Sequence, residues 1–243
     1  MFRSVLYVKE NNNYKLLNYT YNNIVYNTNV IYSQDIYESY EGSNITIFNY
    51  KNQWYYTTSK CLDKLDLTNN LSFGMMLLET FDNNKENLKK LENNMNKENN
   101  YNFILVNYKN KYIKDYTDVF GLNYTKLIYT DCKNQETQLP LEDENFNKFI
   151  SEDNTFKNIL KPNKVDYKKV NLNNKEYIIK KYDGFILKIT KLVSSDYLFK
   201  KDLKGNFNNA LEVYIYNFKK NKLDDLLMHL KSYNIVLYNL NMK

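Results

Sequence analysis

Two short strand-like runs separated by a polar break are the strongest constraint on the fold of this chain. Residues 45–50 and 54–58 are rich in β-branched and aromatic residues, and Lys51-Asn52-Gln53 lies between them. A break of this length is typical of a hairpin between antiparallel strands. Polar clusters at 38–43 and 56–60 flank the two runs. We therefore expect an antiparallel pair whose ends carry polar side chains.

The rest of the chain alternates between strand and helix periodicity. Strand-like runs occupy 3–9, 23–32, 101–106, 111–116, 177–181 and 184–190, and the runs at 101–106 and 111–116 are predicted to form a second hairpin. Helical spacing of apolar residues appears at 71–82, 85–96, 146–150 and 223–232. The asparagine-rich stretch 85–100 is also a candidate for a mobile excursion. The expected fold class is α+β, with mostly antiparallel sheets and flanking helices.

Composition narrows the functional classes. The first ten residues lack the apolar run of a secretion signal, and no apolar run is long enough to span a bilayer, so a cytoplasmic protein without a membrane partner is expected. One histidine and two cysteines cannot build a four-ligand zinc site without carboxylates. No metal site is therefore expected.

Charge is distributed unevenly along the chain. Residues 1–154 contain 16 basic and 20 acidic side chains, whereas residues 155–243 contain 18 basic and 8 acidic ones. A basic region on an otherwise acidic chain indicates a surface for phosphate groups or for an acidic partner.

Four short segments follow one another along the chain: Ser39-Tyr40-Glu41-Gly42, Ser59-Lys60, Tyr101-Asn102-Phe103-Ile104 and Asp183-Gly184-Phe185-Ile186-Leu187-Lys188. Their sequences and their order resemble the motifs of the RNA ligase group of covalent nucleotidyltransferases from phages and large DNA viruses. The resemblance implies an RNA ligase-like nucleotidyltransferase domain over residues 1–205. Residues 206–243 are expected to form a C-terminal helical or strand extension packed on this domain.

The resemblance also implies roles for individual residues. Such enzymes use a lysine amine to attack the α-phosphate of ATP, and carboxylates to orient metal and ribose. Here Ser39 occupies the position of the lysine and Ile104 that of one carboxylate, so both catalytic positions are degenerate. Nucleotide or phosphate binding is assigned to Glu41, Gly42, Ser59, Lys60, Asp183, Gly184, Lys188 and Lys191. No cofactor is expected, and ATP with magnesium becomes relevant only if another lysine restores the ligase reaction.

These features predict a non-enzymatic protein, an RNA ligase-like pseudoenzyme that binds RNA (tRNA among the candidates) or an RNA-acting protein. Two alternatives remain open. The composition also resembles proteins of yeast cytoplasmic killer plasmids, which favours an intracellular immunity protein against an RNA-cleaving toxin. A metal-independent RNA endonuclease would instead need a general base and a general acid, for which Glu10 and His229 are the candidates.

Overall fold

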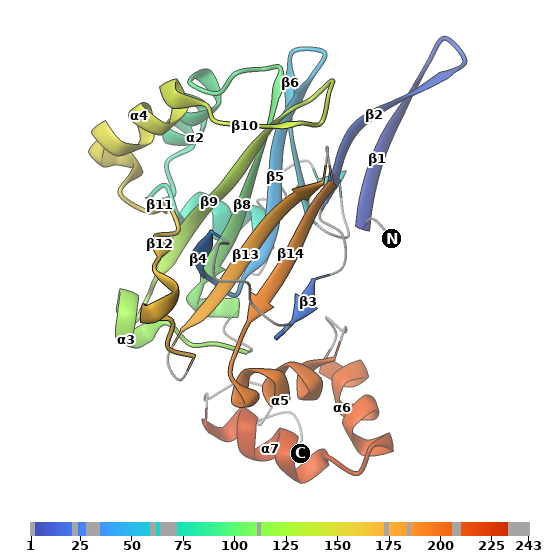
Figure 1. The fold of residues 1–243 in the computed structure, drawn as a ribbon, viewed down its shortest axis with the longest axis vertical. Helices are drawn as coiled ribbons and strands as arrows, with labels where there is room; N and C mark the ends of the chain where they lie inside the picture. Colours follow the sequence, from blue (N-terminus) through green and yellow to red (C-terminus); the bar gives the residue numbers. More distant parts are fainter. Residues whose placement is uncertain are drawn as a thin grey trace.

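The computed structural model has a mixed α+β fold of antiparallel sheets with flanking helices, as the sequence predicts (Figure 1). It describes residues 3–20, 24–27, 35–58, 62–63, 72–110, 113–172, 175–183, 186–205 and 210–232.

The larger sheet has seven strands in the described part of the chain and is built around the predicted hairpin. Its order is β10-β9-β8-β5-β6-β7, and β11 runs parallel to β9. Lys51 and Asn52 have φ angles of 51° and 62°, as the tight turn of a two-residue hairpin requires. The strands are β5 (Ser43–Tyr50), β6 (Gln53–Thr58), β7 (Leu62–Asp63), β8 (Asn99–Asn107), β9 (Thr125–Asn134), β10 (Pro140–Leu141) and β11 (Ile159–Leu160).

The smaller sheet has five strands among the described residues, in the order β12-β4-β13-β14-β3. Its strand β4 ends at Ser39 and pairs antiparallel with β13, so that Ser39 lies opposite Glu176. The strands are β3 (Val25–Tyr26), β4 (Ile36–Ser39), β12 (Lys164–Val165), β13 (Glu176–Asp183) and β14 (Ile186–Leu192). The first two strands, β1 (Arg3–Glu10) and β2 (Asn13–Thr20), form a separate hairpin that projects from the body (Figure 1).

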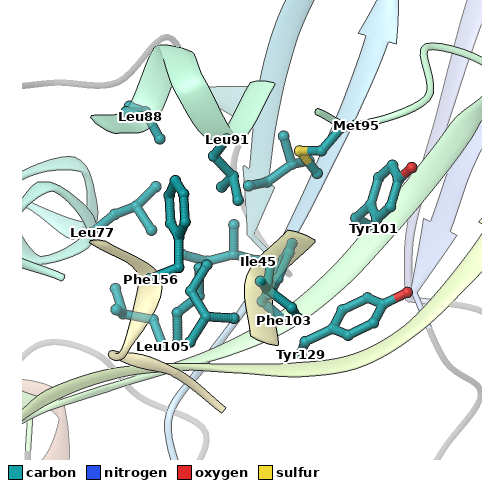
Figure 2. Packing of buried hydrophobic residues seen from close by; sticks show 14 of the residues in the cluster. Ile45, Leu77, Leu88, Leu91, Met95, Tyr101, Phe103, Leu105, Tyr129 and Phe156 are labelled. Carbon is teal, nitrogen blue, oxygen red and sulfur yellow. The ribbon is translucent and has the colours of Figure 1, made fainter. Parts of the chain in front are cut away.

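The main hydrophobic core lies between the larger sheet and three helices. Phe103 and Leu105 of β8 pack there against helix side chains such as Leu77 and Leu91 (Figure 2). The helices are α1 (Phe73–Glu79), α2 (Lys85–Asn93) and α4 (Glu144–Glu152). Residues 85–100 are therefore not an excursion, because Leu88, Leu91 and Met95 anchor them in the core.

The prediction of a second hairpin between residues 101–106 and 111–116 is wrong. Strand β8 pairs with β5 and β9, and residues 113–116 form no strand. A 3₁₀-helix at Tyr108–Asn110 and the short helix α3 (Thr117–Phe120) occupy this region, and 111–112 lie outside the described residues. Further 3₁₀-helices lie at Asn154–Phe156 and Tyr167–Lys169.

Three helices follow the last strand and share a small core. Leu203 of α5 packs with Val213 of α6 and with Leu226 and Leu230 of α7. The helices are α5 (Ser195–Lys204), α6 (Ala210–Lys219) and α7 (Leu223–Ser232). The helical unit thus begins at Ser195, whereas the predicted boundary at 205 separates α5 from its packing partners. The run at 235–240 lies outside the described residues. Over the described ranges, no helix has the length and apolar character needed to cross a membrane.

Candidate functional site

A cavity of about 130 Å³ lies between the two sheets and beneath α5. Strand β4 and the residues that follow it contribute Ser39, Glu41 and Gly42, and β8 contributes Ile104. The remaining described lining residues are Ile24, Tyr26, Tyr40, Asn44, Thr130, Ile178, Lys180, Ile189, Lys191, Tyr197 and Lys201. The structure therefore brings four of the predicted positions, together with Lys191, to one place.

An ion pair occupies the polar end of the cavity. The Lys191 ammonium donates to the Glu41 carboxylate over 2.9 Å and to the Tyr197 hydroxyl over 2.8 Å, and Tyr197 donates to the same carboxylate oxygen. The exposed fraction of the side chain is 6% for Lys191 and 27% for Glu41. Burial opposes ionisation of Glu41, but the ammonium and the hydroxyl outweigh it, so the pKa of Glu41 is lowered. Burial raises the pKa of Tyr197, which stays a neutral donor.

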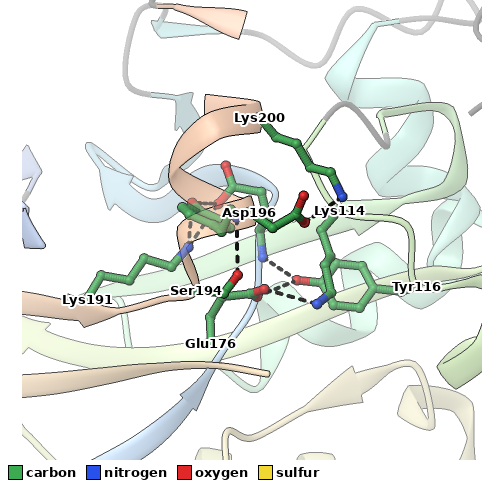
Figure 3. A network of polar contacts seen from close by, with 9 residues as sticks. Lys114, Tyr116, Glu176, Lys191, Ser194, Asp196 and Lys200 are labelled. Carbon is green, nitrogen blue, oxygen red and sulfur yellow. Dashed lines mark hydrogen bonds and ion pairs between the residues drawn. The ribbon is translucent and has the colours of Figure 1, made fainter. Parts of the chain in front are cut away.

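A second carboxylate extends this network. Glu176, with a 5% exposed side chain, accepts from Lys114 over 3.1 Å and from the Tyr116 hydroxyl over 3.4 Å. The Tyr116 hydroxyl in turn accepts a 2.7 Å hydrogen bond from the backbone N–H of Glu41. Figure 3 shows Lys191, Glu176, Tyr116 and Lys114 converging below the start of α5. Strands of the smaller sheet are thus connected to the 113–116 segment through one buried network.

Ser39 and Ile104 both line this cavity. Ser39 is 8% exposed at the end of β4, opposite Glu176 in the strand register. Ile104 is on β8 and lines the same cavity. Ser39 therefore brings a hydroxyl to the lining of the cavity, and Ile104 brings a hydrocarbon side chain.

Gly42 has a packing reason to be a glycine. A Cβ atom at this position would lie 2.3 Å from the carbonyl oxygen of Leu105 on β8. The backbone between β4 and β5 can approach β8 only without a side chain there.

The backbone of Asp183 lies at the turn between β13 and β14, opposite Ile186. Glu176, on the same strand, is the residue opposite Ser39. Seven residues at about 3.3 Å each place the backbone of Asp183 roughly 23 Å further along the strand. The predicted neighbourhood of Glu41 and Asp183 is therefore not formed.

The remaining predicted phosphate-binding positions are not part of the described cavity. Lys188 is exposed near the same turn, opposite Lys181. Ser59, Lys60 and Gly184 lie outside the described residues.

Glu176 is the site residue that sequence reasoning missed. The segment Glu176-Tyr177-Ile178-Ile179-Lys180-Lys181 follows the same acid, hydrophobic pair and lysine pattern as the segment at 183–188, with tyrosine in place of glycine. Gly184 made Asp183 the better match to the motif, but the pairing of β13 with β4 places Glu176 opposite Ser39. Lys114 and Tyr116 carry no such signal, because only the tertiary fold brings them to Glu176.

The acid–base pair of an endonuclease is not formed. Glu10 is on the β1–β2 hairpin, where its carboxylate accepts from the Tyr50 hydroxyl over 2.8 Å. His229 is 6% exposed on α7, at the opposite end of the molecule (Figure 1). The two side chains cannot act on one phosphodiester. Within the described ranges, no group of three or more His, Cys, Asp or Glu side chains is placed to hold a metal ion.

Comparison with solved structures identifies the type of fold. No family model and no curated protein matches the sequence. Among solved structures, the chain is similar to a "putative ATP-dependent DNA ligase" from Aquifex aeolicus, with a TM-score of 0.51, 15% identity, and coverage of 96% of this chain and 73% of that one. An archaeal ATP-dependent RNA ligase aligns with a TM-score of 0.42 and 12% identity, over 84% of this chain and 58% of that one. The Aquifex match shows that the chain has the nucleotidyltransferase-type fold of the ATP-dependent ligases.

Proposed function

We propose that this protein is an RNA ligase-like pseudoenzyme that binds RNA without transferring a nucleotide to itself. The observation that carries the proposal is the chemistry of the cavity: Ser39, at the position that the resemblance assigns to an amine, lines it with a hydroxyl, and Lys191 is paired with Glu41. Both features favour binding over covalent catalysis.

Formation of a lysyl-nucleotide needs a neutral amine facing the α-phosphate. Three lysines are among the described residues that line the cavity, Lys180, Lys191 and Lys201. The Lys191 ammonium is held by the Glu41 carboxylate, and a protonated amine has no lone pair for attack. Lys180 donates to the carbonyl of Thr130 over 2.6 Å and lies 3.6 Å from the carboxylate of Asp131. These contacts orient both side chains toward protein acceptors.

The cavity is also a poor fit for a nucleotide with its metal. Pockets for small-molecule ligands usually measure about 300–1,000 Å³, whereas this one measures about 130 Å³. Ile104 lines the cavity with a hydrocarbon side chain, which cannot bind a cation. The described lining therefore does not fit ATP with its magnesium ion.

Charge supports RNA as the partner. The excess of basic side chains lies after residue 154, and α5 places Lys201 at the cavity, 3.8 Å from the centre of the Tyr26 ring. Lysines next to aromatic rings suit a phosphate backbone and its bases. An RNA-acting protein, such as a toxin that this chain would neutralise, is the competing partner.

Binding of labelled single-stranded RNA and of tRNA, measured by fluorescence anisotropy at graded salt, tests the proposal. Affinity should fall as salt rises and, at a constant concentration of free magnesium, should be the same with or without ATP. Joined RNA ends, or affinity that depends on ATP, would contradict a pseudoenzyme. High affinity for an RNA-cleaving protein, with none for RNA, would favour the immunity role.

A further inference from the structure

The β1–β2 hairpin has an outward face that carries aromatic and basic side chains. Directly opposed residues share a face, and the register pairs Tyr7 with Leu16 and Lys9 with Tyr14. Tyr7 and Tyr14 are 58% and 71% exposed, and they are diagonal neighbours on the two strands. Diagonal neighbours lie about 7–8 Å apart. The two phenol rings and Lys9 thus form one exposed patch, which we call the hairpin face.

The body of the protein holds the hairpin at its base. The Asn100 side chain donates to the carbonyl of Leu17 over 2.8 Å, and the Lys133 ammonium donates to the carbonyl of Tyr19 over 3.0 Å. Glu10, which lies on the other face, is bound by the Tyr50 hydroxyl. The hairpin is therefore a fixed platform, and a ligand that binds there need not order it first.

Charge on the hairpin fits a polyanion. Glu10 is the one acidic residue between positions 3 and 20, and Lys51 lies 3.6 Å from its carboxylate. Lys9 and Lys15 are exposed on the two faces. The excess of basic over acidic side chains on the hairpin argues against a basic protein as the partner and favours nucleic acid.

We propose that the hairpin face binds single-stranded RNA by stacking bases on Tyr7 and Tyr14, while Lys9 contacts the phosphates. Aromatic side chains on an open sheet face stack with bases of any sequence, because every base has a π-face. The inference rests on the proposed RNA-binding function and assigns to it a surface separate from the cavity between the sheets.

The test is the anisotropy of a labelled single-stranded RNA with wild-type protein and four variants. Tyr7→Ala/Tyr14→Ala should weaken binding roughly tenfold or more, whereas Tyr7→Phe/Tyr14→Phe should stay close to wild type because phenyl rings still stack. Tyr167→Ala, at a 37% exposed tyrosine elsewhere, is the matched control and should not change affinity. Lys9→Gln should reduce the slope of log affinity against log salt by about 0.7.

The outcomes separate this inference from the function on which it rests. Wild-type protein without RNA affinity would reject both. Wild-type affinity that survives the double alanine change, or that falls equally with Tyr167→Ala, would reject the hairpin face alone. Loss of a protein partner by the double alanine variant, with RNA affinity intact, would also reject it.

Discussion

Replacing Lys191 by methionine should show how strongly the cavity depends on its ion pair. Methionine keeps most of the length of the lysine side chain but removes the ammonium group. The Glu41 carboxylate then keeps the hydrogen bond from the Tyr197 hydroxyl. At 2.9 Å and an effective dielectric constant of about 20, the Coulomb attraction is about 6 kcal/mol, and much of it offsets desolvation.

Removal of one partner from a buried pair usually costs about 3–5 kcal/mol. In this variant the Glu41 carboxylate keeps the hydrogen bond from Tyr197, and the side chain is already 27% exposed to solvent. We therefore expect Lys191→Met to lower the free energy of unfolding by about 3 kcal/mol. Adding Glu41→Gln should recover most of this loss, because no uncompensated charge is then buried.

The predicted loss also depends on pH. The folded pKa of Glu41 is lowered from 4.5, so the stability that the pair contributes is present above pH 4.5 and is lost as the pH falls further. The deficit of Lys191→Met should accordingly be largest near neutral pH and should narrow in acid.

Urea denaturation of the wild type, the two single variants and the double variant measures this coupling as a double-mutant cycle. Lys89→Met is the matched control, since Lys89 lies 3.1 Å from Glu86 but both side chains are more than half exposed. The reasoning is refuted if Lys191→Met costs no more than Lys89→Met, or if Glu41→Gln fails to restore stability.

Three further changes test other parts of the structure. Burial lowers the pKa of Lys133 from 10.5 to about 8, so between these pH values the unfolded chain holds a proton that the folded chain has lost. Urea denaturation at each pH should therefore show the stability of the wild type rising relative to that of Lys133→Met by up to about 3 kcal/mol. Gly42→Ala would bring its Cβ to 2.3 Å from the Leu105 carbonyl and should cost about 1–3 kcal/mol in thermal unfolding. An unchanged melting temperature would contradict the steric argument. Tyr116→Phe removes a buried hydroxyl with two hydrogen bonds and should cost about 1–3 kcal/mol, and a neutral result would show that the network does not support the site.

Local patterns predicted the fold class and part of the site. The hairpin at 45–58 was predictable because its apolar runs and its Lys51-Asn52 turn agree. Ser39, Glu41 and Gly42 follow one another in the chain, so a short motif was enough to place them together.

Errors arose where strand pairing overrides local signals. Asp183-Gly184 has the better motif, but the register of β13 against β4 brings Glu176 to Ser39. Asparagines at 85–100 suggested mobility, although Leu88 and Leu91 bury one side of α2. Tyr116 could not be predicted, because its partners Glu41 and Glu176 lie 75 and 60 residues away.

The intact mass of the purified protein after incubation with ATP and magnesium tests the central claim most directly. Our account predicts an unchanged mass, because a hydroxyl stands at Ser39 and the Lys191 ammonium is paired with Glu41. A stable gain of one adenylyl group, located by fragmentation on Lys180, Lys191 or another lysine, would contradict it.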